Sequence, residues 1–213
     1  MPVGVVLVGK GTAHLPHFIY TFEETGRQGL GRERVPFTLE SVEEAAGGRI
    51  VFRRPQRCLL DPGPSPEAAA LQAEAPPGTA ALLETLTSVR LRRDGALLES
   101  PDFPAFFQAV VRRLRALSYF HCGGESNLSD PERIFAAGGA LRAVWEGAAW
   151  REQRRWSTRQ HAFTPLGGFT GRLRLKGDLT LVWPFLRLAE RVHVGKASSF
   201  GLGRFRLTPA DGD

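Results

Sequence analysis

The chain has 213 residues, of which 42% are hydrophobic, and a net charge of +6. This hydrophobic fraction supports a packed core and argues against intrinsic disorder, while the length fits one large domain or two small ones. No apolar run reaches the length of a membrane span, and the first residues lack the pattern of a secretory signal. We therefore expect a soluble, cytoplasmic protein.

Arginine supplies nearly all of the positive charge, because Lys10, Lys176 and Lys196 are the only lysines. A guanidinium group suits phosphates and base edges, so this excess favours nucleic-acid binding, although a GC-rich genome also raises arginine content. Cys58 and Cys122 fall in no metal-ligand spacing, and no histidine–carboxylate cluster does. We expect reduced thiols and neither a metal ion nor another cofactor.

The first 80 residues predict few elements. Residues 3–8 form an apolar run that predicts a buried strand, and residues 14–25 predict a helix that ends at Gly26. Two strands, over residues 35–42 and 49–53, are expected to pair. Proline and alanine dominate residues 62–78. We therefore divide the chain into a partial N-terminal unit (1–58), a linker (59–80) and a complete C-terminal domain (81–213).

The C-terminal domain predicts a regular alternation of strands and helices. The clearest helix covers residues 103–120, where phenylalanine, valine and leucine recur at steps of three and four. Asp130-Pro131 marks a second helix start. The remaining elements are strands over 81–93, 150–157, 169–181 and 205–207 and a helix over 183–192.

The principal order is strand, helix, strand, strand, helix, strand, which is the ferredoxin-like order. Residues 3–42 supply only strand, helix, glycine loop and strand, the last half of such a unit. The predicted fold is therefore α+β, with tandem ferredoxin-like units of which the first is incomplete.

The same glycine-rich motif occurs twice. Residues 26–32 and 195–204 both end in Gly-Leu-Gly-Arg, and each is followed by a predicted strand. Glycines permit close backbone approach, and the neighbouring bases favour a polyanion. A helix stop followed by a tight turn is the structural alternative for both loops. If the loops bind a nucleic-acid strand, the expected contacts are Gly195, Lys196, Ser198, Ser199, Gly201, Gly203, Arg204, Arg27 and Arg32.

Two basic strand segments precede the second loop in the sequence. The basic segment around Trp156 allows two interpretations. It could contact RNA, with a base stacked on Trp156, or it could be a solvated basic strand without a ligand. The expected basic surface comprises Arg155, Arg159, Arg172, Arg174 and Lys176. No Gly-x-Ser-x-Gly elbow occurs, and the phosphate-loop spacing at residues 4–10 fails because Gly11 replaces the Ser or Thr.

Histidine is the main candidate for acid–base chemistry. His193 comes two residues before the second glycine loop, so its imidazole could take a proton from a bound phosphodiester strand. A helix-end histidine that bonds a backbone carbonyl is an equally open alternative. His121 and Tyr119, at the end of the long helix, are reserve candidates.

Four segments resemble one family. The sequences at 156–160 (WSTRQ), 166–171 (LGGFTG), 193–196 (HVGK) and 199–203 (SFGLG) resemble the C-terminal domain of CRISPR precursor-RNA-processing endoribonucleases, which belong to the RAMP superfamily. Residues 29–32 followed by Phe37 are similar to the equivalent place in their N-terminal domain.

The resemblance implies tandem ferredoxin-like domains and metal-independent cleavage of CRISPR repeat RNA that leaves a cyclic 2′,3′-phosphate. It implies CRISPR repeat RNA or crRNA as a partner, with other Cas effector subunits as further partners. In many members the catalytic histidine lies early in the N-terminal domain, in a part without a counterpart here. His193 is then the first choice as general base and Lys196 as the group that stabilises the phosphorane. A non-catalytic crRNA-binding subunit is the alternative.

Overall fold

A computed structural model describes residues 2–45, 47–56, 58–61, 70, 74–123, 130–157 and 159–210. The chain divides into two compact units, an N-terminal unit (1–66) and a C-terminal unit (67–213). Both mix helices with antiparallel strands, so the fold class is α+β, as predicted. Within the described ranges, no helix is long and apolar enough to cross a membrane.

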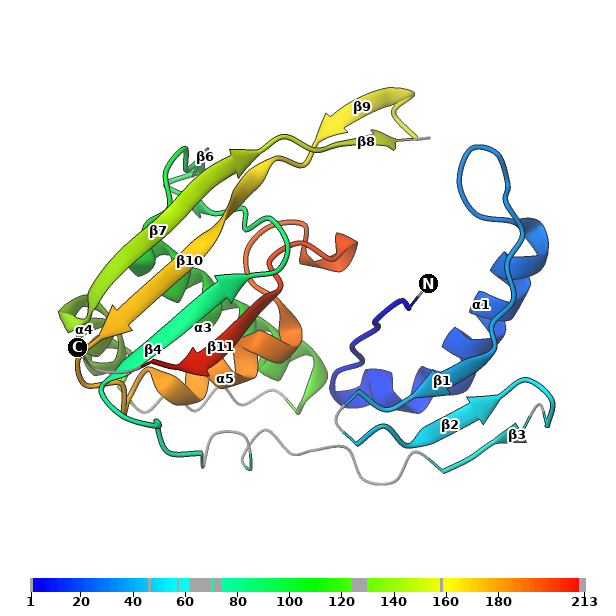
Figure 1. Ribbon diagram of the computed structural model, residues 1–213, viewed down its shortest axis with the longest axis horizontal. Coiled ribbons are helices and arrows are strands. Elements are labelled where there is room, and N and C mark those ends of the chain that lie inside the picture. Colours follow the sequence, from blue (N-terminus) through cyan, green and yellow to red (C-terminus); the bar gives the residue numbers. More distant parts are fainter. Residues whose placement is uncertain are drawn as a thin grey trace. The chain divides into compact units, whose positions relative to one another are not determined.

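A four-stranded antiparallel sheet forms the centre of the C-terminal unit (Figure 1). Its strands are β4 (Ala80–Thr85), β7 (Arg142–Arg151), β10 (Gly168–Lys176) and β11 (Phe205–Pro209), in the spatial order β11-β4-β10-β7. Helix α3 (Phe103–His121) connects β4 to β7, and α5 (Trp183–Val192) connects β10 to β11. The arrangement is βαββαβ, so the ferredoxin-like prediction is confirmed for this unit.

Three smaller elements decorate this unit. Helix α4 (Pro131–Ala140) begins where Asp130-Pro131 predicted a start, and the Asp130 side chain accepts a hydrogen bond from the Arg133 amide at 3.0 Å. A short hairpin joins β5 (Arg92–Arg93) to β6 (Ala96–Leu97). A second hairpin, β8 (Arg154–Ser157) with β9 (Ala162–Pro165), extends the β7–β10 pair (Figure 1).

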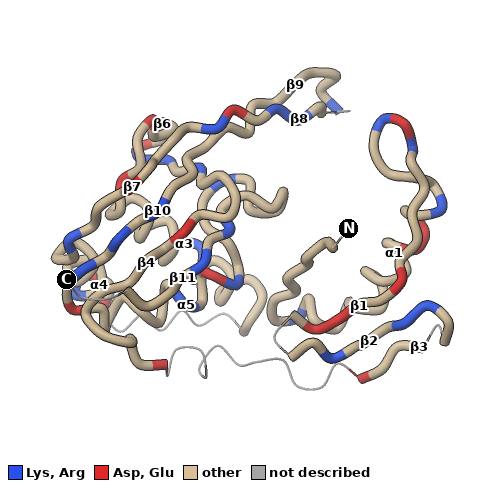
Figure 2. Tube along the Cα trace, in the orientation of Figure 1, with Lys and Arg blue, Asp and Glu red and all other residues tan. Residues whose placement is uncertain are grey.

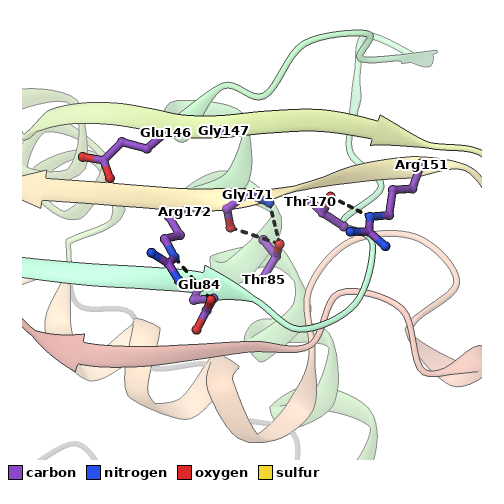
Figure 3. A pocket seen from close by; sticks show the side chains of 8 residues that line it. All are labelled: Glu84, Thr85, Glu146, Gly147, Arg151, Thr170, Gly171 and Arg172. Atoms are coloured by element: carbon purple, nitrogen blue, oxygen red, sulfur yellow. Dashed lines mark hydrogen bonds and ion pairs between the residues drawn. The ribbon is translucent and has the colours of Figure 1, made fainter.

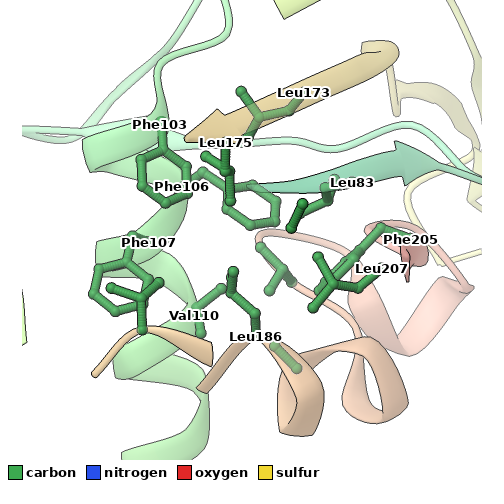
Figure 4. Close-up of a cluster of buried hydrophobic side chains, with 14 of the residues drawn as sticks. Leu83, Phe103, Phe106, Phe107, Val110, Leu173, Leu175, Leu186, Phe205 and Leu207 are labelled. Atoms are coloured by element: carbon green, nitrogen blue, oxygen red, sulfur yellow. The ribbon is translucent and has the colours of Figure 1, made fainter. Parts of the chain in front are cut away.

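The core lies between one face of the sheet and the helices α3 and α5 (Figure 4). The apolar stripe of α3 is buried as its spacing predicted, and Phe106 packs edge-on against Phe205 with ring centroids 5.6 Å apart. Leu83, Leu173 and Leu186 belong to the same core cluster and are fully buried. Burial of one such side chain contributes roughly 1.5–3 kcal/mol, so this core holds both helices to the sheet.

Three strand predictions in this unit are wrong in extent. The strand expected over 169–181 is β10, which ends at Lys176. The strand expected over 81–93 ends at Thr85, and Asp94-Gly95 instead turns the β5–β6 hairpin. The strand expected over 150–157 is split between the end of β7 and β8. Most of β7 went unpredicted because its residues are largely exposed, so its sequence has no strong apolar alternation.

The described residues of the N-terminal unit form a 3₁₀ turn, one helix and a three-stranded meander. These elements are η1 (Gly9–His14), α1 (Leu15–Gln28), β1 (Ser41–Glu43), β2 (Ile50–Arg53) and β3 (Cys58–Leu59). The predicted helix is confirmed, but it does not end at Gly26 as expected and continues to Gln28. Strand β2 pairs with β1 as expected. The strand predicted over 35–42 is wrong in extent, because only Ser41 and Val42 of that range enter β1.

The buried strand predicted over residues 3–8 is wrong. These residues have no regular structure, and Val3, Val5 and Val6 are exposed. A strand needs a neighbour for its hydrogen bonds, and none lies beside this segment in the described part of the unit. The predicted linker begins within β3 and ends at the start of β4, and residues 62–69 and 71–73 within it lie outside the described residues.

Candidate functional site

The second glycine loop follows α5 and closes on itself. The Val194 amide donates to the Gly203 carbonyl at 3.0 Å, which joins the two ends of the loop. The segment after β4 holds the loop from outside, because the Gly203 amide donates to Ser88 and the Lys196 amide to the Arg90 carbonyl, at 2.9 and 2.8 Å. The loop therefore has a fixed conformation at the edge of the sheet.

Two of its glycines are required by the protein's own backbone. A Cβ on Gly195 would lie 2.5 Å from the Arg90 carbonyl oxygen, and one on Gly203 would lie 1.8 Å from that of Val194. Gly201 has a positive φ of 84° but open space around it. The close approaches expected toward a ligand are thus made, at Gly195 and Gly203, to other parts of the chain.

Most backbone amides of the loop are also used internally. Those of residues 200–204 all donate within the protein, the last to the Thr87 hydroxyl at 2.9 Å. Within the described ranges, four amides of the loop have no acceptor: Gly195, Ala197, Ser198 and Ser199. Three of them are consecutive and open the short turn η2 (Ser198–Phe200), with the exposed Lys196 beside them. An anion-binding role is therefore confined to this stretch.

His193 ends α5 with a backbone of φ 62° and ψ 163°, a region almost restricted to glycine. Its half-buried imidazole has a hydrogen bond with the Leu202 backbone. Burial lowers the pKa of His193 below its ordinary value, the Leu202 bond opposes this, and the charges of Arg204 and Arg113 lower it further. The imidazole therefore binds a proton less readily than an ordinary histidine side chain, with one ring nitrogen directed to Leu202 and the other able to accept a proton.

Arg155 on β8 reaches the glycine loop. Its guanidinium carbon lies 4.3 Å from the centroid of the Phe200 ring, a cation–π contact. Arg90 supports the same hairpin by donating from Nη1 to the Pro165 and Gly167 carbonyls, at 2.9 and 3.1 Å. Arg159 lies exposed at the hairpin turn. The fold thus brings Arg155 into contact with the loop. No contact between Arg159 and the loop occurs among the described residues.

The other predicted basic residues lie on the open face of the sheet, opposite the buried leucines of β10. Arg172 pairs with Glu84 at 3.3 Å, and Arg174 pairs with Glu146 at 3.0 Å. Lys176 lies farther along β10, in register with Arg142. Acidic residues of the neighbouring strands β4 and β7 therefore pair with two arginines of β10, which makes this face less basic than β10 alone predicted. Figure 2 shows basic and acidic positions along these strands.

A shallow depression of about 420 Å³ opens beside these ion pairs (Figure 3). It lies where Gly147, with a φ of 60°, bulges out of β7 opposite Gly171. Thr85 bridges the irregularity, accepting from the Gly171 amide at 2.8 Å, and Arg151 donates to Thr170 at 3.2 Å. The sequence did not single out these polar residues, because the bulge that gathers them exists only in the paired strands.

The reserve candidates Tyr119 and His121 lie exposed at the end of α3. Tyr119 contacts only its neighbour Phe120 among ring pairs of the described chain, with centroids 5.0 Å apart. No interaction between described residues joins either side chain to the glycine loop. The structure therefore does not assemble them with His193 and Lys196.

The first glycine loop is likewise built on contacts within its own unit. A Cβ on Gly29 would lie 2.1 Å from the Arg34 carbonyl oxygen, and one on Gly26 would lie 2.3 Å from that of Phe37. Leu30 and Val35 exchange backbone hydrogen bonds of 2.8 and 3.0 Å, which makes the loop a tight turn. Arg27 pairs with Glu24 at 3.0 Å, and Arg32 is exposed.

A family model for the CRISPR-associated endoribonuclease Cas6 matches residues 83–205, more than half of the chain. The chain belongs to the Cas6 family. A second model, described as an N-terminal domain, matches residues 1–63. No curated protein matches the sequence.

Solved Cas6 structures share the fold. A Cas6 (TTHB231) product complex has a TM-score of 0.62 and 17% identity, covering 91% of this chain and 71% of that one. A Cas6 (TTHA0078) product complex has a TM-score of 0.56 and 20% identity, covering 95% and 74%. For Thermus thermophilus Cas6 (TTHB231) the TM-score is 0.51 at 17% identity and 73% of this chain is covered. The present chain spans 61% of the length of that Cas6.

Proposed function

We propose that the protein binds CRISPR repeat RNA and cleaves it within the repeat without a metal ion. The observation that carries this proposal is the position of the His193 imidazole at the base of the glycine loop. Free amides at residues 197–199, the exposed Lys196 and Arg204 offer hydrogen bonds and positive charge to a phosphodiester. Membership of the Cas6 family supports RNA as the polyanion.

The proposed reaction uses the RNA's own 2′-hydroxyl. His193 removes its proton through the ring nitrogen that does not face Leu202, and the 2′-oxygen attacks the adjacent phosphorus. The bond from phosphorus to the 5′-oxygen breaks, so the products carry a cyclic 2′,3′-phosphate and a 5′-hydroxyl. Lys196 stabilises the negative charge of the phosphorane and can supply the proton that the leaving 5′-oxygen needs. Tyr119 and His121 remain reserve candidates.

Binding by the glycine loop is proposed to involve the free backbone amides of Gly195, Ser198 and Ser199, with Lys196 and Arg204 as cations. Gly201 and Gly203, whose amides are bonded within the protein, would serve this binding by shaping the loop. Arg155 and Arg159 extend this surface along the β8–β9 hairpin. Arg172, Arg174 and Lys176 form its continuation on the sheet, and Arg27 and Arg32 form a separate contact in the N-terminal unit.

A non-catalytic crRNA-binding subunit, assembled with other Cas effector subunits, is the second candidate. It is favoured by one observation: the His193 imidazole is half-buried and already bonded to Leu202. Such an arrangement can equally hold the loop in place for binding alone. In that case His193 positions the glycine loop and touches no reacting atom.

A cleavage assay on repeat RNA in EDTA separates the two candidates. The enzyme should release a product with a cyclic phosphate end, which resists phosphatase until acid opens it. His193→Ala should lower the rate by about two to four decades while repeat binding stays nearly intact. His17→Ala, on an exposed histidine of α1, is the control and should keep the wild-type rate. A protein that binds repeat RNA but yields no product is the binding subunit.

A further inference from the structure

The β8–β9 hairpin carries an exposed aromatic pair. Trp156 and Phe163 are register partners, and their ring centroids lie 5.1 Å apart in an edge-to-face arrangement. Trp156 is 49% exposed and Phe163 is 64% exposed. Packing of the described chain does not account for them, since large aromatic side chains normally bury most of their area. A pair left open in this way indicates a contact with a ligand or partner.

The opposite face of the hairpin is fixed to the glycine loop. Side chains alternate along a strand, so Arg155 faces away from Trp156, and its guanidinium lies over Phe200. Arg90 holds the other strand through its bonds to the Pro165 and Gly167 carbonyls. The aromatic pair is therefore presented on a supported ribbon, next to the loop proposed to bind RNA.

The charge around the pair is of one sign. Residues 154–165 contain three arginines and no aspartate or glutamate. Arg154 shares the face of Trp156 by strand alternation, and neither Arg154 nor Arg159 forms an ion pair within the described residues. On the sheet, by contrast, Arg172 and Arg174 each have a carboxylate partner. Open aromatic rings among unpaired cations match a single-stranded nucleic acid, because bases stack on rings and cations meet phosphates.

We propose that Trp156 and Phe163 form a stacking platform for an unpaired base of the RNA, with Arg154 and Arg159 contacting the adjoining phosphates. This inference rests on the proposed RNA binding. It adds that the protein recognises a base of the RNA that lies outside a duplex. Bases inside a duplex are stacked on both sides, so they cannot use the platform. Because the hairpin contacts the glycine loop through Phe200, the stacked nucleotide lies beside the strand that the loop holds.

The test measures RNA affinity and 2-aminopurine fluorescence for variants that keep an aromatic ring at the platform and for variants that remove one. The repeat RNA carries 2-aminopurine, a fluorescent base, at one unpaired position at a time. Trp156→Leu should weaken binding roughly 5- to 150-fold, the range for loss of one stacked base. Its salt dependence should not change, since no charge is removed. Trp156→Phe should keep most of the affinity, and wild-type protein should quench 2-aminopurine at one position where Trp156→Leu does not. Phe163→Leu should behave like Trp156→Leu.

Phe120→Leu is the matched control. Phe120 is 70% exposed and also sits in an edge-to-face ring pair, but on α3, and this variant should bind RNA as the wild type does. Circular dichroism melts establish that each variant is folded, which is expected because the altered rings are exposed.

Three outcomes would overturn the platform. If wild-type protein binds repeat RNA and Trp156→Leu and Phe163→Leu bind it equally well with unchanged quenching, the platform is wrong while the proposed function stands. If sedimentation shows that these variants lose a dimer while RNA affinity is intact, the pair is a contact between two copies of the chain. If the wild type binds no RNA, the proposed function fails together with the platform.

Discussion

Gly203 lies so close to Val194 that a Cβ atom on it would come within 1.8 Å of the Val194 carbonyl oxygen. The contact closes the glycine loop, because the Val194 amide also donates to the Gly203 carbonyl. Glycine at this position therefore serves the architecture of the loop first. Any RNA contact at Gly203 depends on the loop being closed.

The two neighbouring glycines give a direct test of this role. Gly203→Ala should lower the free energy of unfolding by at least about 2 kcal/mol, because the substitution adds a steric clash to an unfavourable positive φ. Gly201→Ala has the same backbone problem but open space, so it should cost only about 1–2 kcal/mol. Urea unfolding measures both, and equal losses would show that the contact with Val194 yields when crowded.

The backbone conformation of His193 predicts that His193→Gly is more stable than His193→Ala, the reverse of the usual order for these two residues. Alanine normally stabilises a folded chain relative to glycine, by about 0.5–1 kcal/mol. At φ 62° and ψ 163° the strain on a residue with a Cβ is about 1–3 kcal/mol, so His193→Gly should be more stable than His193→Ala. Chemical denaturation of the two variants decides it. If the alanine variant is the more stable one, the backbone at this position is not strained.

The pH dependence follows from the lowered pKa of His193. Since the folded state binds its proton less readily than the unfolded state, the contribution of His193 to stability is complete above about pH 6.5 and falls as the pH drops below it. If His193 is the general base, the acid limb of the cleavage profile should lie below the ordinary histidine pKa. A limb at or above about 6.5 would contradict the role of a neutral, half-buried imidazole.

Arg204→Gln should shift the acid limb of the cleavage profile to higher pH. The charge of Arg204 lowers the pKa of His193, so its removal should raise the imidazole pKa toward the ordinary value and shift the acid limb upward. NMR titration of the imidazole measures the pKa without any need for activity. The same variant should reduce the salt dependence of RNA binding by about one unit of slope. An unchanged slope would remove Arg204 from the phosphate path.

The ion pairs on the open face test whether RNA reaches the sheet. In the variant Glu84→Gln/Glu146→Gln, Arg172 and Arg174 lose their carboxylate partners and become available to phosphates. RNA affinity should rise, and its salt dependence should steepen by up to about one unit of slope for each freed arginine. Glu99→Gln removes one negative charge, against two in the double variant, at an exposed position outside this face and is the control, with the change compared per charge. If both variants behave alike, the RNA does not contact β10.

Several features were readable from the sequence because their causes are local. The stripe of α3 repeats with the helical period, so the buried face from Phe103 to Val111 could be predicted without knowledge of what covers it. Asp130-Pro131 predicted its helix start because a cap acts on the next turn. The order of strands and helices then predicted the ferredoxin-like unit. Residues 3–8 show the limit of this reasoning, since an apolar run becomes a strand only beside a partner.

The pattern of the glycine loop, its bases and His193 was determined by the sequence alone, but their chemistry was decided by residues far along the chain. Gly195 is constrained by the Arg90 carbonyl, Arg172 is paired with Glu84 across 88 positions, and Phe200 lies under Arg155. Sheet register and loop packing create these contacts, and neither has a local signal. Tertiary structure therefore determined which amides and cations stay free, because a group already bonded within the protein is not available to a ligand.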